Sequence, residues 1–159
     1  RMITIGGIYS LVPHTRPPYV FGAFNNVSLK GMLEKANVRH GNYDGPAGFN
    51  AVLLTAATAI NLDSIGLAIN VPDYWRYFSI TYTRGYQTIL KTLEEMLGPD
   101  ADFGSKVLDD DAIASDQKMD ECLSHNPQLR EQLARLEVSY DENKKTEESD
   151  ANVKKMLSF

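Results

Sequence analysis

A length of 159 residues and an apolar fraction of 43% are typical of one ordinary globular domain. Residues 1–99 carry eight basic and six acidic side chains, whereas residues 100–159 carry eight and fifteen. This acidic C-terminal third argues against nucleic acid as a partner, because phosphate binding needs a basic face. The single Cys122 excludes an internal disulfide and fits a reducing compartment. We expect a cytoplasmic protein without a signal peptide or a membrane-spanning segment.

The first elements in chain order are short. Met2–Ile5 reads as a strand that Gly6 and Gly7 end or bend, and the prolines of Ile8–Pro18 indicate a loop. The aromatic run Tyr19–Phe24 predicts the next strand. A helix then follows an N-cap at Ser28, and its apolar stripe has helical spacing: Leu29, Met32, Leu33 and Ala36.

The stretch Tyr43–Leu62 predicts a helix that is apolar on nearly every face. Such a helix belongs inside a domain, so we expect it to be covered on more than one side. The run Ser64–Val71 follows it with apolar residues on both faces and predicts a buried strand. A helix followed by a buried strand indicates an α/β layered fold.

The remaining elements are an aromatic loop at Pro72–Phe78 and an amphipathic helix over 86–97, which Gly98 and Pro99 end. From residue 100 the composition becomes acidic. We expect residues 1–99 to be the C-terminal part of an α/β domain, residues 100–140 an acidic helical appendage, and residues 141–159 a polar, disordered tail.

Gly45 and Gly48 flank a proline at the start of the apolar helix. Free backbone N–H groups there can hold an anion, but no lysine follows to complete a phosphate-binding loop. Close packing of the helix on a sheet explains the glycines equally well.

His14 and Arg16 lie on a proline-rich loop after a strand, where α/β proteins often bind ligands. In a structural role, His14 fills space with its hydrogen bonds satisfied. Arg16 then bonds carbonyls or an acid such as Asp44 or Asp73. We favour this structural role for both side chains.

Asp73, Tyr74 and Arg76 follow the predicted buried strand. They can share a crevice with His14 and Arg16, or they can form a protein-interaction patch, because tyrosine, tryptophan and arginine dominate interface hot spots. The composition favours the interface.

The remaining candidate chemistry is sparse. The three histidines are far apart in the sequence and lack metal-ligand companions, so we assign no metal. No G-x-S-x-G elbow supports a hydrolase triad. We assign no catalytic residue and no cofactor.

Three runs in order, LVPHTRP at 11–17, YDGPAG at 43–48 and AINVPDY at 68–74, resemble the PAC2 family. This family contains the proteasome assembly chaperones and their archaeal and bacterial relatives. Its members share a V-P-H-T-R-P loop, a Y-x-G-P-x-G helix entry and an apolar strand ending in V-P-H-Y. Asp73 stands where many relatives have histidine.

The resemblance implies an α/β domain with a mixed sheet and helices on both faces, of the phosphorylase/hydrolase-like kind. It also implies that the family's N-terminal portion is absent here, so we expect an incomplete fragment. Prokaryotic members tend to form homo-oligomers, often trimers.

The resemblance therefore favours a non-enzymatic assembly or interaction factor with a protein partner, such as proteasome α subunits. The alternative is an enzyme that binds a small anionic substrate at the strand C-terminal ends, of the carboxylate-amine ligase-like or nucleoside phosphorylase-like kind. His14, Arg16 and the helix entry from Gly45 to Gly48 would then line the pocket.

Overall fold

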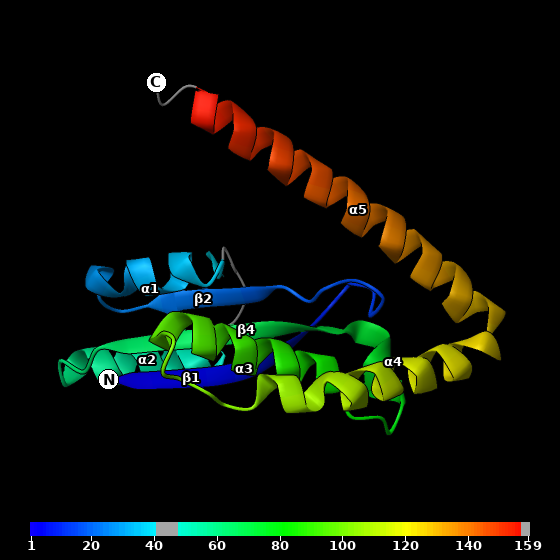
Figure 1. Cartoon of the computed structure of the whole chain (residues 1–159), viewed down its shortest axis with the longest axis horizontal. Coiled ribbons are helices and arrows are strands. Elements are labelled where there is room, and N and C mark those ends of the chain that lie inside the picture. Colours follow the sequence, from blue (N-terminus) through cyan, green and yellow to red (C-terminus); the bar gives the residue numbers. More distant parts are fainter. Residues whose placement is uncertain (41–47, 157–159) are drawn as a thin grey trace.

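A mixed sheet of four strands organises the fold (Figure 1). The computed structural model describes residues 1–40 and 48–156. The strands run in the order β1-β4-β2-β3, and their bounds are β1 Met2–Ser10, β2 Val20–Phe24, β3 Arg39–His40 and β4 Ser64–Pro72. β4 is parallel to β1 and antiparallel to β2, while β2 is parallel to β3.

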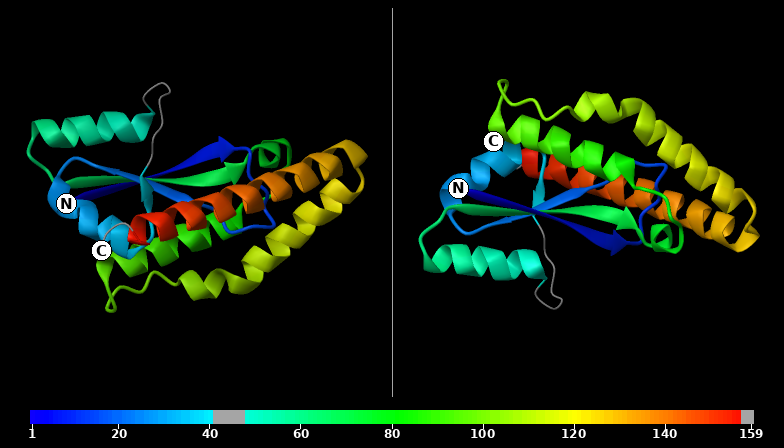
Figure 2. Two further views of the ribbon diagram at one scale, coloured as in Figure 1. Left: turned by 90° about the horizontal axis from the view of Figure 1, so that it is seen from above. Right: turned by 90° about the horizontal axis from the view of Figure 1, so that it is seen from below.

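Helices lie on both faces of this sheet, which confirms the predicted fold class. Figure 2 shows α2 alone on one face and α1 and α3 on the other, with α4 beside α3 and α5 returning from the end of α4. The bounds are α1 Lys30–Lys35, α2 Phe49–Ala59, α3 Thr83–Leu97, α4 Asp109–Ser124 and α5 Pro127–Met156. Short 3-10 helices connect them: η1 Val27–Leu29, η2 Asp73–Tyr77 and η3 Ser105–Leu108.

β1 continues to Ser10, so of the two alternatives for the glycines, an end of the strand is wrong. The first residues of the predicted loop, 8–10, belong to the strand as well. The strand pairs with β4 over its full length, from Met2 opposite Ser64 to Ser10 opposite Pro72. Gly6 faces α2, and a Cβ there would lie 3.1 Å from the Asn50 amide nitrogen. The glycine therefore makes room for a helix that approaches closely.

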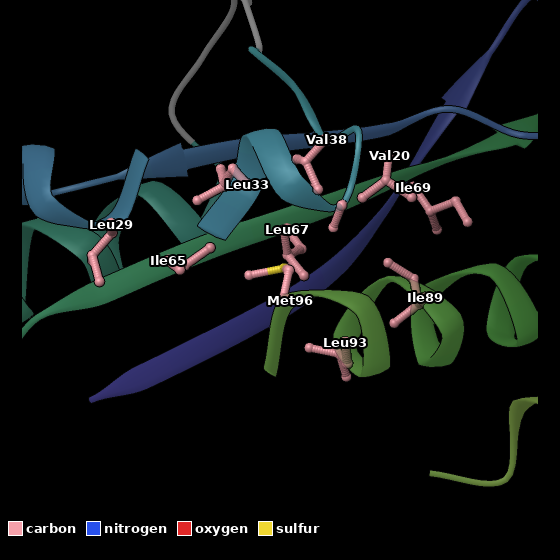
Figure 3. Packing of buried hydrophobic residues seen from close by; sticks show 11 residues of the cluster. Val20, Leu29, Leu33, Val38, Ile65, Leu67, Ile69, Ile89, Leu93 and Met96 are labelled. Atoms are coloured by element: carbon pink, nitrogen blue, oxygen red, sulfur yellow. The ribbon is translucent and has the colours of Figure 1, made fainter. Parts of the chain in front are cut away.

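The main core lies between the sheet and the α1/α3 layer (Figure 3). Ile65 and Leu67 of β4 are fully buried there, as the apolar run over 64–71 predicts. Figure 3 shows their side chains among those of β2, α1 and α3. The buried members are Val20, Leu29, Leu33, Ala36, Val38, Ile65, Leu67, Ile69, Ile89, Leu93 and Met96.

α2 differs most from the expectation, because a helix predicted to be covered on several sides is largely exposed. Ala57 is its one buried residue. Phe49 is 76% exposed, and Ile60, the C-cap residue, is 72% exposed. α2 contacts the sheet at β1 and β4 through one narrow side, and its outer side faces solvent.

The ends of the other helices follow local rules, with one correction. Gly98 ends α3 at a φ of 107°, a conformation that glycine adopts without strain, as predicted. Ser28 is not a cap, because it lies inside η1, the short helix that leads into α1. The N-cap of η1 is Asn26, whose side chain accepts a hydrogen bond from the Ser28 N–H.

A second hydrophobic cluster joins the C-terminal helices to the aromatic segment at 73–82. Trp75 and Tyr82 pack there against Met119 and Leu123 of α4, and Leu129, Leu133 and Leu136 of α5 cover them. α5 continues through Asp141, where the polar composition predicted disorder. The division of the chain at residues 99 and 140 stays a prediction.

Candidate functional site

His14 lies at the centre of a buried polar contact between the loop after β1, η2 and α4. It is only 1% exposed. Its backbone N–H donates to the Tyr74 hydroxyl oxygen at 2.8 Å, and its ring Nδ1 lies 2.7 Å from the same oxygen. Its Nε2 lies 3.1 Å from Asp120 Oδ1.

These contacts fit one tautomer of His14. The Tyr74 oxygen already accepts the backbone N–H, so its own O–H is free to donate to Nδ1. Nε2–H then donates to the Asp120 carboxylate. Burial raises the pKa of Tyr74 above its ordinary value, which keeps the hydroxyl protonated as a donor. His14 is thus buried with both of its ring nitrogens in hydrogen bonds.

Arg16 holds α5 against the same loop. Its Nε and one terminal nitrogen donate to the two oxygens of Asp141 at 2.9 and 2.8 Å, and its other terminal nitrogen lies 3.5 Å from Glu137. Thr15 also donates to Glu137 at 2.5 Å. The hydrogen bond to Asp141 raises the pKa of Arg16, and the same bond lowers the pKa of Asp141.

An acid does bind Arg16, as expected, but it is neither Asp44 nor Asp73. The partners come from α5, and the side chain of Arg16 keeps 32% exposure. Asp73 forms an ion pair with Arg76 on its own short helix, η2. Asp44 lies outside the described residues.

A cavity of about 360 Å³ adjoins His14 and Arg16. Arg84 lines it from α3, but Asp116 of α4 binds that guanidinium at 2.5 Å. Both arginines of the cavity are thus paired with carboxylates, and its further lining residues are Thr15, Pro17, Pro18 and Thr88. An anionic substrate would have to displace Asp116 or Asp141, so the arrangement does not support the enzyme alternative.

An exposed aromatic and basic surface lies at the C-terminal ends of β1 and β4. The Arg76 guanidinium lies 4.4 Å from the centre of the Tyr9 ring. Tyr77 is 70% exposed and Leu11 is 72% exposed. We call Leu11, Arg76 and Tyr77 the Tyr77 patch.

The structure brings only some of the predicted site residues together. His14 and Tyr74 are in direct contact, and Arg16 lies on the same loop as His14. Gly48 is the exposed N-cap of α2, on the other face of the sheet, and Gly45 lies outside the described residues. A role of these residues in binding a ligand or partner stays a prediction.

Sequence reasoning missed the acids of α4 and α5 that complete this site. Asp120, Glu137 and Asp141 are more than 100 residues away from the loop in sequence. The apolar residues at 129, 133, 136 and 140 have helical spacing and predict a helix that packs through one side. This pattern does not indicate which loop the helix contacts.

The described part of the chain holds neither a metal-binding cluster nor a membrane-spanning helix. Among residues 1–40 and 48–156, no group of three or more histidine, cysteine, aspartate or glutamate side chains is placed to hold a metal ion. Within the same ranges, every helix is too short or too polar to cross a membrane.

The chain belongs to the PAC2 family, whose model matches residues 1–123. This match includes α3 and almost all of α4, so it extends beyond the segment that carries the three sequence motifs. The comparison with curated proteins gave no match.

Solved structures share the fold at low identity. A Mycobacterium tuberculosis protein of unknown function is 21% identical with a TM-score of 0.76, covering 95% of this chain and 49% of that one. A proteasome-assembly chaperone homologue from the same organism is 21% identical with a TM-score of 0.65, covering 84% and 52%. An archaeal proteasome activator from Pyrococcus furiosus is 21% identical with a TM-score of 0.59, covering 77% and 50%. The chain thus spans about half the length of the solved structures it matches.

Proposed function

We propose that this chain is a PAC2-type assembly or interaction factor that binds a protein partner in the cytoplasm. The observation that carries this proposal is the Tyr77 patch. It presents tyrosine, arginine and leucine side chains to solvent. Tyr77 is 70% exposed and Leu11 is 72% exposed. Tyrosine and arginine are the residue types that supply most binding energy at protein interfaces.

Proteasome α subunits are the partner class that we propose. Support comes from the names of similar structures, one a proteasome-assembly chaperone homologue and one an archaeal proteasome activator. The proposal also includes a homo-oligomeric state, which the family resemblance implies.

The test measures binding of purified proteasome α subunits to this chain by biolayer interferometry. Tyr77→Ala removes an exposed ring from the patch, and we expect it to weaken binding about tenfold or more. Tyr86→Ala is the matched control, because Tyr86 is a 62% exposed tyrosine on α3. Binding by neither parent nor variants, or equal loss in both variants, would reject the proposal.

A further inference from the structure

The distal part of α5, residues 140–156, is held in place differently from the part before it. We call these residues the strap. Tyr140 is buried and Asp141 is half-buried, whereas residues 142–149 are all exposed. Figure 1 shows the strap extending from the packed part of α5 toward the end of the molecule that holds α1. Three leucines before the strap pack against the second hydrophobic cluster: Leu129, Leu133 and Leu136.

Two arginines hold the strap through partly exposed ion pairs. Asp141 binds Arg16, and Glu147 accepts hydrogen bonds from both terminal nitrogens of Arg39 at 3.0 and 2.6 Å. The side chains of Arg16 and Arg39 keep 32% and 31% exposure, so water and salt compete with both pairs. Two lysines stand between these acids in the sequence, at 144 and 145, and their charge repels the same arginines. The strap is therefore a weakly held cover.

The surface under the strap is basic and aromatic. The Arg39 guanidinium carbon lies 3.3 Å from the centre of the Tyr19 ring. The Tyr19 ring also stacks on the ring of Tyr140, with 4.8 Å between the ring centres and 4° between the planes. The Tyr140 hydroxyl donates to the Pro17 carbonyl oxygen at 2.7 Å. We call Arg16, Tyr19 and Arg39 the strap site.

The contacts of the strap show which chemistry this site recognises. Tyr140 supplies a ring and a hydroxyl donor, and the two carboxylates that follow it supply charge for the two guanidinium groups. Tyrosine and arginine dominate interface hot spots. An acidic helix that carries a tyrosine but no lysine can make the same contacts without the repulsion that the strap experiences.

We propose that the strap site is a docking site for an acidic, tyrosine-containing helix of another protein, and that the strap covers this site until the helix displaces it. The site lies within residues 1–123, which match the family model, and the strap lies beyond them. Because the strap is in the same chain, its effective concentration is high, and weak ion pairs suffice to keep it closed. A second copy of the chain offers the same lysines and has no advantage over the strap. The strap site is separate from the Tyr77 patch, so this inference goes beyond the proposed function.

The test measures binding of a labelled peptide to the full chain by fluorescence anisotropy. The probe has the sequence of residues 133–149 with Lys144→Glu and Lys145→Glu, and a scrambled peptide of the same composition is its control. An opened variant of the chain combines three changes: Tyr140→Ala, Asp141→Ala and Glu147→Ala. We expect this variant to bind the probe about tenfold or more tightly than the parent, because its strap no longer competes.

The matched control for the opened variant is Glu142→Ala with Glu148→Ala. This variant removes two exposed acids beside those that bind the arginines, so it should bind the probe like the parent. A second opened variant changes only the two arginine-binding acids and keeps Tyr140, so its buried ring stays in place. We expect it to have an intermediate affinity. Circular dichroism of every variant checks that the fold is native.

Arg16→Ala or Arg39→Ala in the opened variant should weaken probe binding about tenfold or more, because each removes a guanidinium group of the strap site. Equal binding by the parent and both opened variants, equal binding of the scrambled peptide, or binding that survives both arginine changes would overturn the proposal. A dimer that exchanges α5 between copies, measured by light scattering, would assign the site to a second copy and also overturn it. All of these changes leave the Tyr77 patch intact, so failure here is distinct from failure of the proposed function.

Discussion

The two faces of the sheet differ in how well they are covered. On the α1/α3 face, eleven buried hydrophobic residues form one cluster in which Ile65 and Leu67 are completely inaccessible to solvent. On the other face, α2 buries only Ala57. Yet α2 is the more hydrophobic helix, whereas α3 is strongly amphipathic. The apolar content of a helix therefore does not determine how much of the helix is buried.

The closeness of the helix to the sheet explains part of this difference. α2 sits over small residues: a Cβ at Gly6 would approach Asn50, and one at Gly66 would lie 2.7 Å from Leu54. The Asn50 side-chain amide also donates to the Leu67 carbonyl at 3.1 Å. One side of α2 is thus fixed by close contact, and the opposite side has nothing in the described structure to cover it.

The largest expected effect compares one leucine from each face. Leu67→Ala should cost about 2–5 kcal/mol of unfolding free energy, because it leaves a cavity in a packed core. Leu53→Ala should cost clearly less, because Leu53 of α2 is only half-buried. Urea denaturation of both variants measures the difference. Equal losses would show that the two faces are packed alike in solution.

A smaller effect comes from adding a methyl group to a glycine of each face. Gly22→Ala places a Cβ 2.4 Å from Leu33 and 2.6 Å from Val38, both within the packed core. We expect a cost of about 1–3 kcal/mol from overpacking. Gly66→Ala meets the end of Leu54, a half-buried side chain that can turn toward solvent, so its cost should be lower. Thermal unfolding of the two variants gives the order, and a reversed order would contradict this account.

The smallest expected effect concerns the ion pair between Arg16 and Asp141, which holds α5 against the loop after β1. The hydrogen bond from Arg16 lowers the pKa of Asp141 below its ordinary value. A carboxylate whose folded pKa is lowered stabilises the fold above its unfolded pKa of about 4, and this contribution is lost as the pH falls through the folded value. We therefore expect α5 to become more sensitive to pepsin as the pH drops below about 4.

Arg16→Ala is the control for this pH dependence. The variant lacks the partner of Asp141, so α5 should already be more sensitive to proteolysis at neutral pH when a neutral protease is used. The acid-dependent increase should then be smaller than in the parent. If proteolysis of α5 in the Arg16→Ala variant depended on pH as it does in the parent, groups other than Asp141 would cause the acid sensitivity.

The sequence by itself determined the local elements and the family. The apolar run over 64–71 gives the central strand because a strand buried on both faces has no polar alternation. The stripe over 86–97 and the glycine after it give α3 and its end, because both signals lie within one helix. The LVPHTRP, YDGPAG and AINVPDY runs pointed to the PAC2 family, which the family model confirms.

Only the tertiary structure decided which elements meet. β1 continues through its glycines because β4 pairs with all nine of its residues. Arg16 binds Asp141, 125 residues away, because α5 folds back over the loop after β1. α2 is exposed because burial depends on what packs against a helix, and an apolar pattern specifies a buried face without specifying the element that covers it.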